Sequence, residues 1–236
     1  MKRLLLAFLF LLMASPSWAA LVRGTPATLE QDASGDPWTF TLTTTAGQNV
    51  LVLLCYASNA SDVFTNATFN GDAMSDVAGA SGFNAGAATS TAAFVLATPD
   101  IGTTLTVSVD MTVSSDGACV AIAYSGGDTA TPVSGAVFEE EDSVASTNQN
   151  VTCAVGGEVL SVAGIPSVEV LTEQTGQTPL LTGDDSTGAY MFSYEAGSGT
   201  NNVGASRTGS GSWAHGALCV QAGAATRRPT APIIFQ

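Results

Sequence analysis

The stretch STAAFVLATPDIG, residues 90–102, returns in the second half of the chain as STGAYMFSYEAGSG, residues 186–199, with one residue inserted. The similarity continues on both sides of this pair. The flanking matches are AGQNVLVLLCYAS (46–58) with VGGEVLSVAGIPS (155–167) and, more roughly, DGACVAIAYSGG (116–127) with AHGALCVQAG (214–223). A chain that repeats one strand pattern predicts a scaffold built from two related halves.

Apolar residues alternate with Thr, Ser and Gly at period two, turn residues recur between the alternating runs, and helix signals are absent. This pattern predicts an all-β fold, an antiparallel β-sandwich of jelly-roll or Ig-like type with roughly 10–12 strands. We expect a lead-in over 20–37 and a duplicated sandwich over 38–223, with halves at about 38–127 and 147–223 and a crossover at 128–146. A single sandwich is favoured, because each half would bury the open face of the other. The expected strands are 38–45, 50–57, 65–70, 91–97, 104–109, 119–124, 150–154, 158–163, 168–172, 189–195, 202–206 and 217–221.

A series of strand and turn motifs runs through the region 38–223. In chain order it reads NGDAM (70–74), TPDIGTTLTVSV (98–109), DGACVAIAYSGGD (116–128), NVTCAVGGEVL (150–160), TGQTPLL (175–181) and SWAHGALCVQAG (212–223). This series resembles a β-sandwich domain of uncharacterised secreted bacterial surface proteins and phage virion proteins. The resemblance implies a sandwich fold and a role at a surface or in a virion, and it brings no catalytic residues.

The N-terminus predicts export. Lys2 and Arg3 precede the apolar run LLLAFLFLLM (4–13), and SWA (17–19) supplies the small residues for cleavage between Ala19 and Ala20. Ten apolar residues extend only about 15 Å as a helix, half the thickness of a bilayer core. We therefore expect a signal peptide over residues 1–19, no later membrane span, and a chain that is secreted, at the cell surface or in the periplasm.

The mature chain is strongly acidic. Its basic residues are four arginines, Arg23, Arg207, Arg227 and Arg228, and against twenty acidic residues they leave a net charge of −16. A surface of this charge repels nucleic acid and anionic lipid. The composition therefore excludes nucleic-acid binding as a function.

Four cysteines in an exported chain suggest two disulfides, although four cysteines allow three pairings. Cys55 ends one predicted strand and Cys119 begins another, so antiparallel neighbours bring these two together. The same reasoning pairs Cys153 with Cys219. The alternative is that some of the four are buried thiols.

The search for reactive groups finds little. His215 is the only histidine, it begins the last strand, and no G-x-S-x-G elbow exists in the chain. The acidic clusters Glu139–Asp142 and Asp184-Asp185 are expected in solvated loops, where they are at most weak calcium candidates, since hard cations take loop carboxylates. We expect no catalytic residue, no metal and no cofactor.

Tyr190, Phe192 and Tyr194 lie on one face of a predicted strand. The aligned residues of the first half are Phe94, Leu96 and Thr98, so Tyr190 and Phe192 are expected in the core. Tyr194 has no apolar counterpart and is the best candidate for an aromatic residue that contacts a ligand.

After Gly223 the strand pattern stops, and the extended tail 224–236 contains two prolines, two arginines and the apolar tip IIF (233–235). The tail is expected to lie along the sandwich edge, or to dock on a partner or a second copy by adding a strand.

Three functional classes follow. The first is a secreted, non-catalytic module that binds an unknown protein or glycan at a surface. The second is a phage decoration or tail-associated protein. The third, resting on the acidic loops and Tyr194, is a secreted carbohydrate-active hydrolase.

Overall fold

The computed structural model describes residues 20–31, 36–59, 61–185 and 187–224. The predicted signal peptide, 1–19, and residues 225–236 of the predicted tail lie outside this part. The described chain forms seventeen strands and one three-residue 3₁₀ turn, η1 (Ala78–Ala80). Twelve of these strands have five residues or more, and the all-β antiparallel fold predicted from the sequence is confirmed. Among the described residues there is no helix that is long and apolar enough to cross a membrane.

The first half of the chain builds two packed sheets. A seven-stranded sheet has the order β1 (Val22–Arg23), β11 (Asp116–Ser125), β4 (Gln48–Ser58), β9 (Thr89–Ala97) and β7 (Ser75–Asp76), with β2 (Ala27–Gln31) on β11 and β8 (Gly82–Asn84) on β9. A four-stranded sheet has the order β3 (Trp38–Thr44), β10 (Gly102–Met111), β5 (Phe64–Phe69) and β6 (Asp72–Ala73). The lead-in therefore belongs to the fold, because β1 and β2 both pair with β11.

The second half forms one six-stranded sheet that folds back on itself to make two layers. Its order is β12 (Val133–Cys153), β17 (Gly199–Val220), β13 (Glu158–Ile165), β16 (Ala189–Ala196) and β15 (Thr178–Asp184), with β14 (Thr172–Glu173) on β17. The β12–β17 pairing is interrupted between Glu141 and Ser146. Residues beyond the interruption, such as Val151 and Val203, share an apolar cluster with Val159 of β13 and Ala217 of β17. The outer parts of β12 and β17 thus fold over β13 as a second layer, making a second sandwich.

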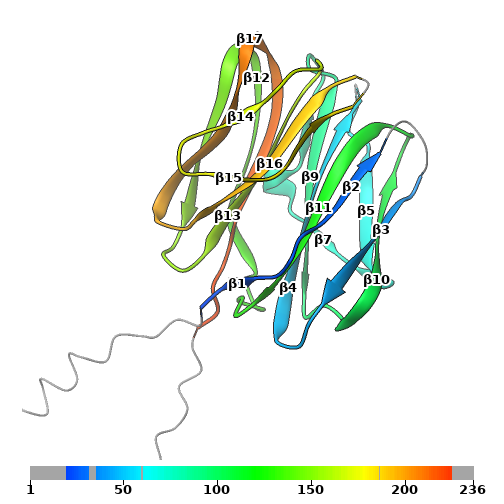
Figure 1. The fold of residues 1–236 in the computed structure, drawn as a ribbon, viewed down its shortest axis with the longest axis vertical. Helices are drawn as coiled ribbons and strands as arrows, with labels where there is room; N and C mark the ends of the chain where they lie inside the picture. Colours follow the sequence, from blue (N-terminus) through cyan, green and yellow to red (C-terminus); the bar gives the residue numbers. More distant parts are fainter. Residues whose placement is uncertain (1–19, 32–35, 60, 186, 225–236) are drawn as a thin grey trace, which may run out of the picture.

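The seven-stranded sheet of the first sandwich packs against β13, β16 and the end of β17 in the second. Figure 1 shows the blue-to-green strands on one side and the yellow-to-orange strands on the other. Alternate residues of β4 account for this arrangement. Leu51 and Leu53 point into the first sandwich, whereas Val52 and Leu54 join a cluster with Val162 and other residues of the second. Both faces of β4 are covered, which is why the run VLVLLCYA reads as continuously apolar.

Polar contacts close the interface at its two ends. At one end the Tyr56 hydroxyl donates to the Ile165 carbonyl at 3.2 Å, and the hydroxyls of Ser58 and Thr187 are hydrogen-bonded at 2.7 Å. At the other end the hydroxyl of Tyr124, on β11, donates to the Glu158 carboxylate at 2.7 Å. These bonds satisfy polar groups at the borders of an apolar contact.

Both predicted disulfides are present, and they have different structural roles. Cys55 and Cys119 face each other across β4 and β11 of one sheet, as expected of antiparallel neighbours. Cys153 and Cys219 are not opposite each other, since Cys153 pairs in register with Gly199. The second bridge instead joins the outer layer of the second sandwich to its inner sheet.

Several element predictions were wrong. The crossover 128–146 is not a loop, because most of it belongs to β12, which pairs with β17 from Val133 onward. The expected strand 168–172 is mostly loop, and the expected strands 202–206 and 217–221 are parts of the single strand β17. The favoured single sandwich is also wrong, since each half has its own two layers.

The internal repeat agrees with the structure in strand order but not in side-chain direction. The orders β11-β4-β9 and β17-β13-β16 correspond. In the sequence alignment, however, Phe94 matches Tyr190, and Phe94 points into its own sandwich whereas Tyr190 points into the interface between the sandwiches. A shift of one residue reverses the face of every side chain in a strand. The duplication remains a sequence-based prediction.

Candidate functional site

Tyr194, the predicted ligand-contacting aromatic residue, lies half-buried at the Glu158 end of the interface. The Arg23 guanidinium lies 3.3 Å from the centre of its ring and also pairs with Glu158 at 3.3 Å. A hydrogen bond with Arg23 lowers the pKa of Tyr194, and burial raises the pKa of Glu158. One face of the Tyr194 ring is therefore occupied by a cation from the same chain, and its role in ligand contact stays a prediction.

His215 is fully buried inside the second sandwich. Its Nδ1 lies 2.9 Å from the Thr147 hydroxyl, and burial lowers its pKa to about 3. The carbonyl of His215 accepts a hydrogen bond from the Gln149 amide. These contacts give His215 a place in the polar interior of the sandwich, away from solvent.

The two acidic clusters proposed as calcium candidates are separate and differ in structure. Glu139–Asp142 lie in the strand β12, not in the expected loop, because its three glutamates pair with residues 213–215 of β17. Asp184 ends β15, and Asp185 begins the turn to β16. The described residues contain no group of three or more His, Cys, Asp or Glu side chains placed to hold a metal ion.

Asp185 has a local structural role. Its Oδ1 accepts hydrogen bonds from the backbone N–H groups of Thr187 and Gly188, at 2.8 and 2.6 Å, and from the Thr187 hydroxyl. Burial raises the pKa of the Asp185 carboxyl, and these bonds oppose that shift. The carboxylate thereby fixes the tight turn that carries Thr187 to its contact with Ser58.

A groove in the second sandwich lies beside Asp184. It has a cavity volume of about 160 Å³ and is lined by Glu169, Val170, Leu171, Thr182, Gly183 and Asp184. One wall is the loop 166–171 and the other is the end of β15. Val168 and Val170 on the loop are 55% and 83% exposed, the second being the most exposed large apolar side chain of the described residues. We refer to this feature as the β15 groove.

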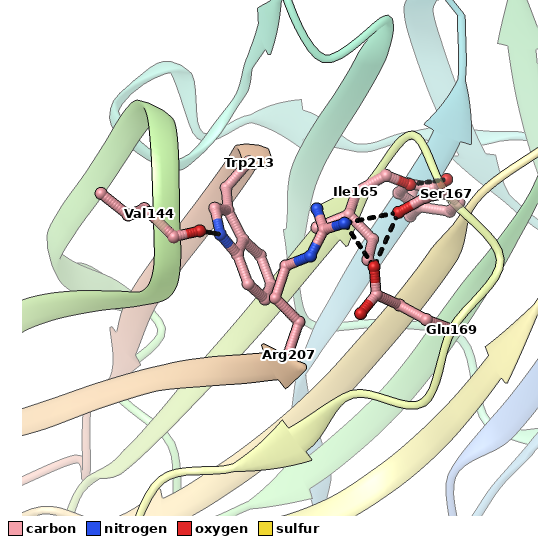
Figure 2. Close-up of polar contacts among 7 residues, drawn as sticks. Val144, Ile165, Ser167, Glu169, Arg207 and Trp213 are labelled. Atoms are coloured by element: carbon pink, nitrogen blue, oxygen red, sulfur yellow. Dashed lines mark hydrogen bonds and ion pairs between the residues drawn. The ribbon is translucent and has the colours of Figure 1, made fainter. Parts of the chain in front are cut away.

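Arg207, a residue of β17, holds the loop wall of the groove in place. Its guanidinium pairs with the Glu169 carboxylate and donates to the Ser167 hydroxyl at 2.8 Å, and Ser167 donates to Glu169 at 2.9 Å (Figure 2). Figure 2 also shows Trp213, whose indole N–H donates to the Val144 carbonyl at 3.2 Å. This ion pair orients the loop so that Glu169 turns toward Arg207 while its neighbouring valines face solvent.

The strand wall of the groove is the edge of a sheet, since in the described part of the chain β15 pairs only with β16. The backbone N–H of Asp185 donates to the Gly188 carbonyl at 2.9 Å, so Asp185 and Gly188 form a hydrogen-bonded pair. Hydrogen-bonded and non-hydrogen-bonded pairs alternate along an antiparallel ladder. The backbone N–H and C=O groups of Asp184 and Thr182 therefore point away from β16, toward the groove.

The first sandwich has a smaller hollow, of about 80 Å³, between its two sheets. Its polar lining includes Asp62 and Asp76, and burial together with the charge of Asp76 raises the pKa of Asp62. Ser81 donates to Asp76 at 2.7 Å. This hollow offers half the volume of the β15 groove, and its carboxylates are already partly engaged within the chain.

Sequence reasoning found one residue of the groove, Asp184, and missed the rest. Val168 and Val170 alternate with Glu169, and this alternation was interpreted as a half-buried strand. The ion pair of Glu169 with Arg207 joins residues distant in the sequence and leaves no local signal. Tyr194 and Asp184 stand at opposite ends of the β15–β16 ladder, so the structure does not bring the predicted ligand residues together.

Comparisons with known proteins identify no relative: no family model, curated protein or solved structure matches this chain.

Proposed function

We propose that this chain is a secreted, non-catalytic module that binds a partner at a cell surface or in the surrounding medium, and that the β15 groove is its binding site. The observation that carries the proposal is the combination, in one place, of two exposed valines, a cavity of about 160 Å³ and an unpaired sheet edge. Exposed apolar groups gathered beside a hollow mark interaction sites.

The scaffold supports this proposal. Two disulfides are typical of chains that fold in an oxidising compartment, consistent with the predicted signal peptide. The groove stands beside β16 and β13, most of whose residues are buried on both faces, and the ion pair of Arg207 fixes the loop wall. A rigid site loses little conformational entropy when a ligand binds.

The test uses arrays of glycans and of extended peptides, probed with labelled protein and with two matched variants. Val170→Asp places a charge in the groove, and Val155→Asp places the same charge on another exposed valine, 76% exposed, in the turn between β12 and β13. We expect Val170→Asp to abolish binding to the recognised probes and Val155→Asp to retain it. Equal binding by both variants, or no bound probe of either class, would contradict the proposal.

A further inference from the structure

We propose that the β15 groove takes an extended, basic polypeptide segment of a partner protein, which adds to β15 as a further strand. This inference rests on the proposed function and specifies the chemistry of the partner. A free sheet edge, the charge around it and the shape of the groove each point to this class of ligand.

The edge supplies the main-chain contacts. The N–H and C=O groups of Thr182 and Asp184 point away from β16, and both residues line the groove. An extended segment laid along this edge forms hydrogen bonds with these groups, as in other cases of strand addition. A globular sugar has no regular series of donors and acceptors to match them.

The charge of the groove selects a basic segment. Asp184 is exposed at the rim, and Glu169 lies in the wall, where Arg207 neutralises it. Both arginines of the described residues, Arg23 and Arg207, are paired with glutamates. The described part of the chain is strongly acidic and has no unpaired arginine to repel a lysine or an arginine, and opposite charges steer and orient partners.

The shape of the groove sets the pattern of the segment. Alternate side chains of an added strand point to opposite faces of the sheet. Val170 and Leu171 offer an apolar wall, and no aromatic ring lines the groove for a sugar to stack on. The preferred segment therefore alternates basic residues with aliphatic ones.

The experiment measures the affinity of a peptide of alternating lysine and valine by fluorescence anisotropy, using the full mature protein. The controls are a peptide with glutamate in place of lysine and a lysine–valine peptide N-methylated on alternate backbone nitrogens. We expect binding of the lysine peptide that weakens with salt, a loss of about fivefold in Asp184→Asn, as for one exposed charge pair, and a loss of at least about tenfold on N-methylation.

The possible outcomes separate this inference from the proposed function. Equal affinity for the glutamate peptide, or for the N-methylated peptide, would overturn the strand-addition inference. The strand-addition inference would also be overturned if no peptide bound while a glycan bound the protein and lost its affinity in Val170→Asp. That result would leave the groove as a binding site. Failure of every probe would overturn both.

Discussion

The two sandwiches have corresponding strand orders in their facing sheets but different interiors. The first is filled almost entirely by apolar side chains, among them Trp38, Leu53 and Phe69. The second encloses two groups of hydrogen-bonded polar side chains: Ser161, Ser193 and Gln177 bond one another, and Thr147 and Gln149 both bond His215. One topology thus tolerates two kinds of core, an apolar one and one in which most of the buried polar groups are hydrogen-bonded.

Their free edges differ as well. In the first sandwich the outer side of β9 is covered only by β7 and β8, which have two and three residues. In the second, the corresponding position beyond β16 holds the seven-residue strand β15. Very short edge strands discourage further pairing, whereas a longer edge permits it. At this position the larger sheet of the first sandwich ends in very short strands, whereas the second sandwich ends in β15, and the groove lies beside that strand.

The largest expected effect on stability comes from removing a disulfide. Each closes a loop of similar span, so chain entropy alone gives about 4 kcal/mol for either bridge. We expect the paired change Cys153→Ala and Cys219→Ala to expose the outer layer of the second sandwich to hydrogen exchange, because this bridge joins two layers. The pair Cys55→Ala and Cys119→Ala should lower the free energy of unfolding without such local opening. Identical exchange patterns in the two variants would contradict the distinction.

The next prediction compares substitutions in the interiors of the two sandwiches. Leu53→Ala removes a fully buried leucine from the apolar core, and the free energy of unfolding should fall by about 3 kcal/mol. Ser161→Ala removes one hydroxyl from the polar network of the second sandwich and should cost about 1 kcal/mol. Chemical denaturation of both variants measures the contrast, and equal losses would show that the two cores contribute alike.

The interface between the sandwiches can be probed at Gly216. A Cβ atom there would lie 2.2 Å from the carbonyl oxygen of Ala80, in η1 of the first sandwich. We expect Gly216→Ala to force the sandwiches apart locally and to cost about 2 kcal/mol. Gly209→Ala, in open space on the same strand, is the control. A thermal melt of Gly216→Ala that matches this control would refute the close packing.

The smallest effect is the acid sensitivity of the second interior. The pKa of His215, about 3 in the fold, is lower than its ordinary value, so the unfolded chain binds the extra proton first. His215 therefore contributes its full stability above about pH 6.5, and this contribution is lost as the pH falls toward 3. The raised pKa values of Glu158 and Asp185 act in the opposite direction.

His215→Gln isolates the histidine contribution, because the substituted side chain does not titrate. Denaturation midpoints of the two proteins should converge as the pH is lowered from neutral to about 4. Parallel pH profiles would mean that His215 is not the buried neutral group described above.

The sequence predicted the strands whose pattern is set by neighbours in the chain. Apolar runs and alternating stretches located β4, β9, β10 and β16, and placing Cys55 and Cys119 on neighbouring strands predicted their bridge. Tyr190 and Phe192 are buried as expected, although they point into the interface.

Other features depend on contacts between distant segments. The run EEED, 139–142, was predicted as loop because Glu and Asp are depleted in strands, yet pairing with β17 extends the strand through it. The fold-over of β12 and β17 was missed because the polar stretches EEEDSVAS (139–146) and RTGSGS (207–212) read as connections between separate strands. The groove follows from that fold-over and from the Glu169–Arg207 ion pair, so only Asp184 was found in advance.

The most direct test of the account maps backbone amide chemical shifts while the alternating lysine–valine peptide is titrated into the mature protein. We predict that the shifted amides gather on the second sandwich, at Thr182, Asp184 and the loop 169–171, with the edge strands β7 and β8 unchanged. Shifts centred on β7 and β8, or spread evenly over the acidic surface, would contradict a binding site on the β15 edge.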